Sequence, residues 1–555
     1  MSPDRPLTRR AAVLVLLVFA LLWFGNLDYR KLVRPDEGRY SEVPREMYVS
    51  GDWITPRLNG IKYFEKPPLQ YWATAAAYEA FGEHEWTVRL WPALTGFAGV
   101  LLAYVVGAAL LGPAAGLYSA VALATSMGYM FVAHIATLDM GFTLFMTVAM
   151  AGLLFGLAPH APEHKRTRWI YAAWAGMALA VLSKGLAGIV LPLFVAGLHV
   201  LLERDFSLVK RLRPISGGAL FLAIAAPWFI AVSIANPEFP WFFFVHEHFA
   251  RFLTTVHKRT APWWYFGPIL LLGILPWLLG MLAAFAAAWR KKTERYREKR
   301  FLALWAAAIF VFFSASHSKL PSYILPVFPA LAVLIGMHLA DAGRQVLRGD
   351  IALYFLVGLA VLILAPQAER FSGGGDLALF AAYVPWLRAA GAVVMIGAAG
   401  AWFSAPHRPT AAILAMGFSA LVAEQALMMG HEELAPRTSF YQMAREVRPY
   451  LRPGVPFYSV GTYEQTLPFY LKRTVTLVAF EDEMAYGLQQ QPRLALPDIA
   501  SFERAWRRDP YALAIMPPRL YEQLLAGGLP MREIARNSRH VVATTVTPAS
   551  GGEAR

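Results

Sequence analysis

The sequence predicts a polytopic α-helical membrane protein that carries a soluble α/β domain at its C-terminal end. Of its 555 residues, 57% are hydrophobic and only 16% are charged, whereas about 25% of residues are charged in an average soluble protein. Apolar runs of roughly 20 residues, the length of a membrane span, recur as far as Gly430. Beyond Gly430 the hydropathy falls, and helical and strand-like patterns alternate.

The first apolar run follows the basic segment MSPDRPLTRR and lacks a small-residue cleavage signature. We therefore expect an uncleaved first span with a cytoplasmic N-terminus. Twelve further apolar runs bring the expected number of spans to about thirteen. These runs lie near 88–111, 114–133, 141–157, 169–183, 185–202, 216–235, 266–289, 301–315, 322–340, 351–366, 387–403 and 410–430.

The net charge of +14, from 51 Lys and Arg against 37 Asp and Glu, agrees with this topology. The longer loops expected inside are basic or neutral, as the positive-inside rule requires; they are 158–168, 203–215, 290–300, 341–350 and 404–409. Much of the positive charge is thus a topology signal, which argues against nucleic-acid binding. The absence of cysteine excludes disulfides, zinc-thiolate clusters and a thiol nucleophile.

Two long loops and the C-terminal domain are expected on the outer side. We divide the chain into a membrane domain, 1–430, with large outer loops at 28–86 and 236–265, and an α/β domain, 431–555. The elements expected in the α/β domain are helices at 438–451, 463–471, 500–507 and 517–526 and strands at 455–460, 474–480, 511–517 and 540–547.

The first outer loop contains a pair of carboxylates, Asp36 and Glu37, directly outside the membrane. In a glycosyl-transfer or phosphoryl-handling site, one carboxylate can orient or deprotonate an acceptor while the other holds a hydroxyl or a cation. The alternative is a solvated turn that caps a helix. We expect a short helix on the membrane at Ser41–Tyr48, with Val43 and Met47 on one side and the charged residues Glu42, Arg45 and Glu46 facing out.

Three further charged residues occupy places where charge is costly or unusual. Lys66 precedes two prolines that fix the backbone, and it suits a lipid phosphate or, alternatively, ordinary headgroups. Asp139, at the outer start of a span, is expected to face a polar cavity or to cap the helix. Lys184 is expected at an outer turn, where it could be an interfacial anchor.

The second outer loop, 236–265, mixes aromatic residues with histidines and cations. At helical spacing Phe244, His248 and Arg251 fall on one face, which suits an anionic headgroup above a lipid chain, although an interfacial aromatic belt explains part of the pattern. His246 or His248, with Glu65 from the first loop, could also hold a divalent ion such as zinc, but no strong metal-binding spacing is present.

The string DEGRYSEVPREM, with GDWITPRLNG and YFEKPPLQYW, resembles the first periplasmic loop of the lipid A aminoarabinose transferases. These are polyprenyl-phosphate-dependent glycosyltransferases of the GT-C type, related to protein O-mannosyltransferases. The resemblance continues through TLDMGFTLF, LSKGLAG, HEHFARF with APWWYFGPILLLGILPW, and SKLPSYILPVFPALAVL, and it covers most of the membrane part. The C-terminal part resembles the family only in general layout.

The resemblance implies a bacterial inner-membrane enzyme that transfers 4-amino-4-deoxy-L-arabinose, with inversion, from undecaprenyl phosphate to lipid A phosphates on the periplasmic side. Such a modification confers resistance to polymyxin and other cationic peptides. The C-terminal domain would be periplasmic. The resemblance places the essential acidic residue at Asp36, its companion at Glu37 and a second carboxylate at Asp139. Phosphate-contacting cations fall at Lys66 and Arg251, and cavity-wall contacts at Arg39, Tyr40 and Tyr63.

Three other functions remain open from the residues. A protein O-mannosyltransferase-like enzyme would share the fold and the lipid donor, but its neutral hydroxyl acceptor would need Asp36 as a true base. A transporter of lipid-linked sugars would favour charges in span centres, whereas the suspicious charges gather outside. A structural or sensor protein would leave Asp36, Lys66 and Asp139 without effect on mutation.

Overall fold

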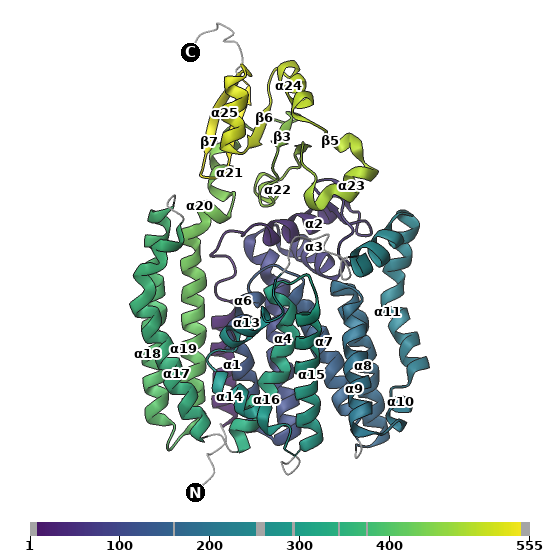
Figure 1. Ribbon diagram of the computed structural model, residues 1–555, viewed down its shortest axis with the longest axis vertical. Helices are drawn as coiled ribbons and strands as arrows, with labels where there is room; N and C mark the ends of the chain where they lie inside the picture. Colours follow the sequence, from purple (N-terminus) through teal and green to yellow (C-terminus); the bar gives the residue numbers. More distant parts are fainter. Residues whose placement is uncertain are drawn as a thin grey trace.

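The computed structural model describes residues 8–158, 161–250, 261–290, 295–341, 344–372 and 376–545. Long helices form the body of the molecule, and a sheet domain stands on one end of them (Figure 1). Helices α2 (Asp36–Ser50) and α3 (Leu69–Phe81), both from the first outer loop, lie between these two parts. The expected combination of an α-helical membrane part and a C-terminal sheet domain is confirmed.

The body is built from apolar helices, most of which are joined by short connections. They are α1 (Arg9–Phe24), α4 (Glu85–Leu111), α5 (Pro113–Ala124), α6 (Met127–Ala133), α7 (Asp139–Gly156), α8 (Glu163–Lys184), α9 (Ala187–Glu203), α11 (Pro214–Ala235), α13 (Phe266–Gly273), α14 (Leu278–Ala287), α15 (Tyr296–Ala315), α16 (Phe328–Asp341), α17 (Arg344–Leu364), α18 (Leu377–Ser404) and α19 (Pro409–Gly430). A short helix, α10 (Ser207–Arg211), joins α9 to α11.

Among the described residues, seven helices are long and apolar enough to cross a membrane, or up to nine if each of two bent pairs is one span. The expected number of thirteen spans is therefore not confirmed. The expected spans at 114–133 and 266–289 are not straight. The chain bends by 65° between α5 and α6 and by 109° between α13 and α14. The two breaks touch each other, since the backbone N–H of Met127 donates to the carbonyl of Leu275 at 3.2 Å.

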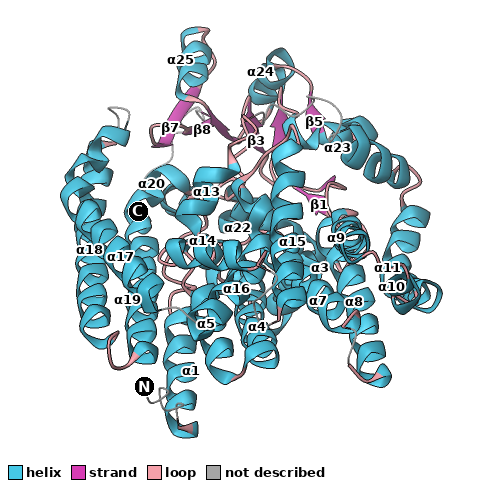
Figure 2. Cartoon of the chain, turned by 60° about the horizontal axis from the view of Figure 1, so that its bottom comes forward, coloured by secondary structure: helices cyan, strands magenta, loops and turns pink. Residues whose placement is uncertain are grey.

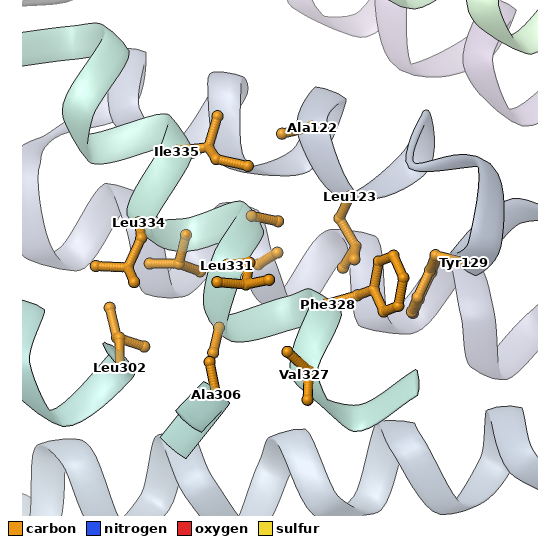
Figure 3. Packing of buried hydrophobic residues seen from close by; sticks show 14 of the residues in the cluster. Ala122, Leu123, Tyr129, Leu302, Ala306, Val327, Phe328, Leu331, Leu334 and Ile335 are labelled. Carbon is orange, nitrogen blue, oxygen red and sulfur yellow. The ribbon is translucent and has the colours of Figure 1, made fainter. Parts of the chain in front are cut away.

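The largest hydrophobic core lies among the membrane helices. Helix α16 packs on α5 and α15, with Phe328 next to Tyr129 and Leu331 and Ile335 facing the α5 side (Figure 3). A Cβ atom at Gly336 would come within 2.5 Å of the backbone nitrogen of Ser119, so only glycine permits this approach of α16 to α5. Small residues thus set the spacing of the central helices.

The C-terminal domain contains a six-stranded sheet with strand order β5-β4-β3-β6-β8-β7. Strands β5, β4, β3 and β6 are parallel, and β8 joins β6 and β7 in antiparallel pairing. The strands are β3 (Phe457–Val460), β4 (Thr476–Val478), β5 (Ala495–Leu496), β6 (Leu513–Met516), β7 (Met531–Arg536) and β8 (Val541–Thr545). Apart from one hairpin of the first loop, the strands gather at one end of the molecule (Figure 2).

The four strands and four helices expected in this domain are present, with shorter bounds except for one helix, α24, which is slightly longer than expected. The helices are α21 (Tyr441–Val447), α22 (Leu467–Leu471), α24 (Ile499–Arg508) and α25 (Pro518–Ala526). The sequence did not predict β5, β7 or α23 (Ala485–Gln490). The charged strand β7 alternates poorly, since Arg532 and Glu533 are both exposed, and this pattern hides it from a hydrophobicity reading.

The first loop and the C-terminal domain share one hydrophobic core. Tyr40, Met47 and Tyr78 belong to the same buried cluster as Phe440 and Leu477. The hairpin of β1 (Arg57–Leu58) and β2 (Ile61–Lys62) is tied to the domain by Asn59, whose side chain donates to the carbonyl of Val475 and accepts from its N–H, both at 2.7 Å.

This shared core corrects the expected orientation of the first-loop helix. Helix α2 begins at Asp36 instead of Ser41, and Glu42 and Arg45 are buried instead of facing out. The Arg45 guanidinium donates two hydrogen bonds of 2.6 Å to the Glu42 carboxylate. The expectation was wrong because the C-terminal domain, rather than water, covers that face of α2.

Candidate active site

The candidate site begins at the first turn of α2, next to the membrane helices. The Asp36 side chain is 49% exposed, and it accepts a hydrogen bond of 3.2 Å from the Arg39 guanidinium one turn later. A carboxylate in the first turn of a helix is stabilised by the helix dipole. Asp36 is therefore an oriented and accessible group at the outer edge of the membrane part.

Arg39 joins Asp36 to the C-terminal domain. Its side chain is only 8% exposed, and its second amino group forms an ion pair with Glu483. Burial raises the pKa of Glu483 to about 7, although the positive charge of Arg39 acts in the opposite direction. The sequence had given the C-terminal domain no chemical group, so Glu483 is a residue that sequence reasoning missed.

Tyrosines of the first loop lie near Arg39, and the role of Tyr40 and Tyr63 as cavity-wall contacts stays a prediction. The Tyr40 ring stacks on Tyr71, with centroids 6.1 Å apart, and the Arg39 guanidinium lies 5.7 Å from the Tyr40 centroid. The buried hydroxyls of Tyr63 and Tyr71 have no hydrogen-bond partner within the described chain. Buried hydroxyls of this kind are ready to bond a polar ligand.

Glu65 and Lys66 follow the hairpin and lead into α3. Both side chains are 16% exposed, the Lys66 ammonium donates to the carbonyl of Glu65 at 2.8 Å, and its nitrogen lies 3.9 Å from the Glu65 carboxylate. Two prolines follow and precede α3, so the backbone that carries Lys66 has little freedom. This places a cation next to a carboxylate, Glu65, that acts electrostatically on both Tyr40 and Glu483.

Asp139 is the first residue of α7, and its side chain forms an ion pair with Lys184, the last residue of α8. The Lys184 nitrogen also lies 4.6 Å from the centroid of the Tyr323 ring. The sequence suggested a simple anchor for Lys184, whereas the structure pairs it with the second candidate carboxylate.

Three of the candidate carboxylates act electrostatically on one tyrosine. The pKa of Tyr40 is raised, chiefly by burial. Arg39 opposes this rise. The carboxylates of Asp36, Glu65 and Asp139 each add to it. These three acidic groups therefore lie within electrostatic reach of Tyr40.

Glu37 occupies a different environment from its neighbour Asp36. Its carboxylate and the guanidinium of Arg89 on α4 are both 0% exposed, and they form two hydrogen bonds of 2.7 Å. Burial alone would raise the pKa of Glu37, but the charge and hydrogen bonds of Arg89 lower it to about 2. Glu37 is thus ionised and enclosed, and a role in direct substrate contact, as the resemblance implied, stays a prediction without support from its surroundings.

The second outer loop is described only in part. His246 lies in a π-helical segment, Trp241–Ala250, and its ring stacks on Phe242 at 5.1 Å. Arg251 lies outside the described residues, and so does the side chain of His248. Within the described chain, no three His, Asp or Glu side chains form a group that could hold a metal ion. The zinc site expected from Glu65 and His246 therefore stays a prediction.

Comparison with known proteins identifies the family to which this arrangement belongs. A model described as dolichyl-phosphate-mannose-protein mannosyltransferase matches residues 9–246, and one described as aminoarabinose transferase C-terminal domain matches residues 443–545. The fold matches the crystal structure of ArnT from Cupriavidus metallidurans bound to undecaprenyl phosphate, with a TM-score of 0.92 and 36% identity over 98% of this chain and 99% of that one. The chain belongs to the aminoarabinose transferase family. The GT-C fold implied by the resemblance is confirmed by this match.

Curated relatives agree with this placement. An undecaprenyl phosphate-alpha-4-amino-4-deoxy-L-arabinose arabinosyl transferase of Pseudomonas fluorescens is 34% identical over 65% of this chain and 62% of its own length. One from Proteus mirabilis is 32% identical over 64% of this chain and 65% of its own length. These alignments span slightly less than two thirds of each relative. The aminoarabinose transferase family therefore covers both parts of the chain, because the solved ArnT structure is matched from end to end.

Proposed function

We propose that this multi-pass membrane protein is a glycosyltransferase that moves 4-amino-4-deoxy-L-arabinose from undecaprenyl phosphate to phosphate groups of lipid A. The observation that carries the proposal is the full-length match to a family member bound to undecaprenyl phosphate. Three charged pairs support it: Asp36 with Arg39 at the start of α2, Lys66 with Glu65 before α3, and Asp139 with Lys184 where α7 begins and α8 ends. Such pairs offer charged groups for a lipid phosphate and a sugar.

We also propose the setting of the reaction. The N-terminus is cytoplasmic and the C-terminal domain periplasmic in the bacterial inner membrane, as the positions of the basic loops favour. Residues 1–430 form the membrane domain and residues 431–555 the outer domain. The acceptor reaches the site from the periplasmic side, because the first loop, which carries the site, packs against the outer domain.

In the proposed reaction, the sugar leaves its phosphate carrier as charge develops on that phosphate. Cations placed where this charge appears lower the barrier. Lys66 and Arg251 are the cations assigned to the leaving phosphate. Arg39, held by Asp36 and Glu483, is a further cation of the first loop that could contribute. Lys184 keeps the Asp139 carboxylate oriented.

The acceptor sets the role of Asp36. A phosphate monoester is largely ionised at neutral pH and needs no strong base. Asp36 therefore positions the acceptor or the sugar, or stabilises the positive charge of an oxocarbenium-like transition state, instead of removing a proton. The attack of a phosphate oxygen on the anomeric carbon, opposite to the leaving carrier phosphate, inverts the sugar.

Asp36→Asn tests this role. The protein is produced in a bacterial strain that lacks its own lipid A aminoarabinose modification, and lipid A is examined by mass spectrometry. We expect a pentosamine increment with the unchanged protein and at least a ~10²-fold loss of transfer with Asp36→Asn. Purified Asp36→Asn should bind undecaprenyl phosphate nearly as well as the unchanged protein.

Asp52→Asn is the matched control, because Asp52 is another partly exposed carboxylate of the same loop that bonds only local backbone N–H groups and lies 3.9 Å from Arg57. It should transfer normally. Loss of donor binding as large as the loss of transfer in Asp36→Asn would refute the proposed role of Asp36. No pentosamine increment with the unchanged protein would refute the proposed function itself.

A protein O-mannosyltransferase-like activity is the second candidate. The matched mannosyltransferase model covers residues 9–246, which include Asp36, Lys66 and Asp139. A hydroxyl acceptor has to lose a proton, so Asp36 would then act as a general base. Transfer of a hexose to protein hydroxyl groups, with unmodified lipid A, would favour this second activity.

A further inference from the structure

Arg89, in the second turn of α4, is a fully buried arginine that uses every N–H group it has. Two of its five N–H groups bond the Glu37 carboxylate. The other three donate to the carbonyls of Leu27, Arg30 and Lys31 at 2.6–3.1 Å. An arginine side chain offers five donors in a rigid fork, and here none is left for water or a ligand. Arg89 therefore fixes the chain that leads from α1 into α2.

Glu37 is equally saturated, and its two oxygens reach two different parts of the chain. One oxygen accepts from Arg89 and from the backbone N–H of Val33 at 2.9 Å. The other accepts from Arg89 and from the backbone N–H of Ala136 at 3.1 Å. One carboxylate thus binds the segment before α2 and the segment before α7 at the same time.

These two segments carry the two candidate carboxylates of the reaction. Asp36 is the residue directly before Glu37, at the start of α2. Asp139 lies three residues after Ala136, at the start of α7. Asp36 and Asp139 are about a hundred positions apart in the sequence, and Glu37 hydrogen-bonds to the backbone beside both. The guanidinium of Arg30 adds a second link between the two segments, because it donates to the carbonyl of His134 at 2.6 Å.

We propose that Glu37 and Arg89 form a positioning pair that fixes Asp36 relative to Asp139. The proposal rests on the proposed function, in which these two carboxylates act on the donor and the acceptor. Glu37 and Arg89 touch neither the donor nor the acceptor, because both are enclosed. Their effect is exerted through the backbone of the two helix starts.

The energetics of buried ion pairs favour a geometric role. Taking both charges out of water largely cancels their attraction, so a fully buried pair adds little to stability compared with apolar side chains of similar size. However, a bidentate pair that uses all its donors and acceptors restricts the groups it bonds to one arrangement. A displacement of about 1 Å between reacting groups can lower a rate by about 10²-fold.

Arg89→Lys tests the pair, because lysine keeps the charge but cannot bond two carboxylate oxygens and three carbonyls together. The matched control is Arg45→Lys. Arg45 also forms a buried bidentate pair, with Glu42 on the same helix α2, but this pair lies within one helix and does not reach the α7 segment. Both variants lose a comparable pair, and only Arg89→Lys loosens the link between the two carboxylates.

Four quantities are compared in the purified proteins: kcat, KM for the lipid-linked donor, thermal stability, and hydrogen exchange in a peptide that covers residues 133–140. For Arg89→Lys we expect kcat to fall about 10²-fold, KM to change less than about threefold, and exchange at Ala136 to rise about tenfold or more. For Arg45→Lys we expect a similar loss of thermal stability, with kcat within about threefold and unchanged exchange at 133–140.

Equal losses of kcat in the two variants, or unchanged exchange at 133–140 in Arg89→Lys, would overturn the proposal. If Arg89→Lys does not fold, Glu37→Gln provides the same test, because glutamine keeps the shape of the side chain but replaces one acceptor oxygen with a donor. Exchange at 133–140 is independent of catalysis. If the unchanged protein shows no transfer activity, the proposed function is refuted. Faster exchange at 133–140 in Arg89→Lys would in that case still support the positioning pair.

Discussion

The substitution Glu483→Gln should increase the stability of the protein above neutral pH and lower its activity. Glu483 belongs to the C-terminal domain, is 10% exposed and pairs with Arg39 of the first loop. Burial raises the pKa of its carboxyl from 4.5 to about 7, and the charge of Glu65 adds to this effect, while Arg39 opposes it. Glutamine has the same shape and cannot ionise.

The size of the effect follows from the two pKa values. Between about pH 4.5 and 7 the folded protein holds a proton that the unfolded chain has already released, so stability falls as pH rises through this window. The rise of the pKa corresponds to roughly 3 kcal/mol, at about 1.4 kcal/mol for each tenfold change. At pH 8 the variant should therefore be more stable by up to roughly 3 kcal/mol, and at pH 4.5 the two proteins should be similar.

Activity should change in the opposite direction, because the ionised carboxylate orients Arg39 beside Asp36. A hydrogen bond to a charged group contributes about 1.5–3 kcal/mol, which corresponds to roughly a 10- to 150-fold loss of transfer rate at pH 8. Transfer by the unchanged protein should rise with a midpoint near pH 7 as Glu483 ionises. This midpoint should be missing in Glu483→Gln.

The assays are thermal unfolding in detergent and initial rates of transfer, both measured from pH 5 to 8.5. The exposed neighbour Glu481 supplies the control, and Glu481→Gln should change neither profile. Destabilisation of Glu483→Gln at pH 8, or an acid limb near pH 7 that persists in the variant, would refute the reasoning.

Two further predictions concern the contact between the first loop and the C-terminal domain. Asn59→Ala removes both bonds to Val475, leaves a buried N–H and a buried carbonyl unpaired and puts alanine at a φ of 57°, so the hairpin should open more easily by roughly 2–6 kcal/mol. Hydrogen exchange at Val475, directly before β4, measures this opening. Asn59→Gly separates the backbone strain from the lost bonds. Unchanged protection in both variants would contradict the prediction. Gly38→Ala should impair folding and transfer, because its Cβ would lie 2.5–2.6 Å from the backbone of Gln465, whereas Gly197→Ala in α9 meets no atom within 4 Å and should be tolerated. Equal yield and thermal stability of the two alanine variants would show that the close approach at Gly38 is not required.

The sequence alone determined the class of the protein and the groups that deserve attention. Hydropathy sums over about 20 neighbouring residues, so spans and the outer domain can be recognised without any knowledge of packing. Asp36, Lys66 and Asp139 stand out for a related reason, because a charge beside an apolar run is costly unless it has a partner or a function. The family motifs then connected these residues with a lipid-phosphate donor.

Tertiary structure decided which charges are enclosed and which face the site. Asp36 and Glu37 are neighbours in the sequence, yet one is half exposed and the other has no exposed surface, because Arg89 approaches only one of them. Glu42 and Arg45 have the spacing of a solvated helix face, but the C-terminal domain buries them. Glu483 reaches the site across more than 400 positions of sequence. Burial and ion pairing depend on such distant contacts, which a local pattern does not contain, so only the folded chain distinguishes a reactive carboxylate from one that holds its neighbours in place.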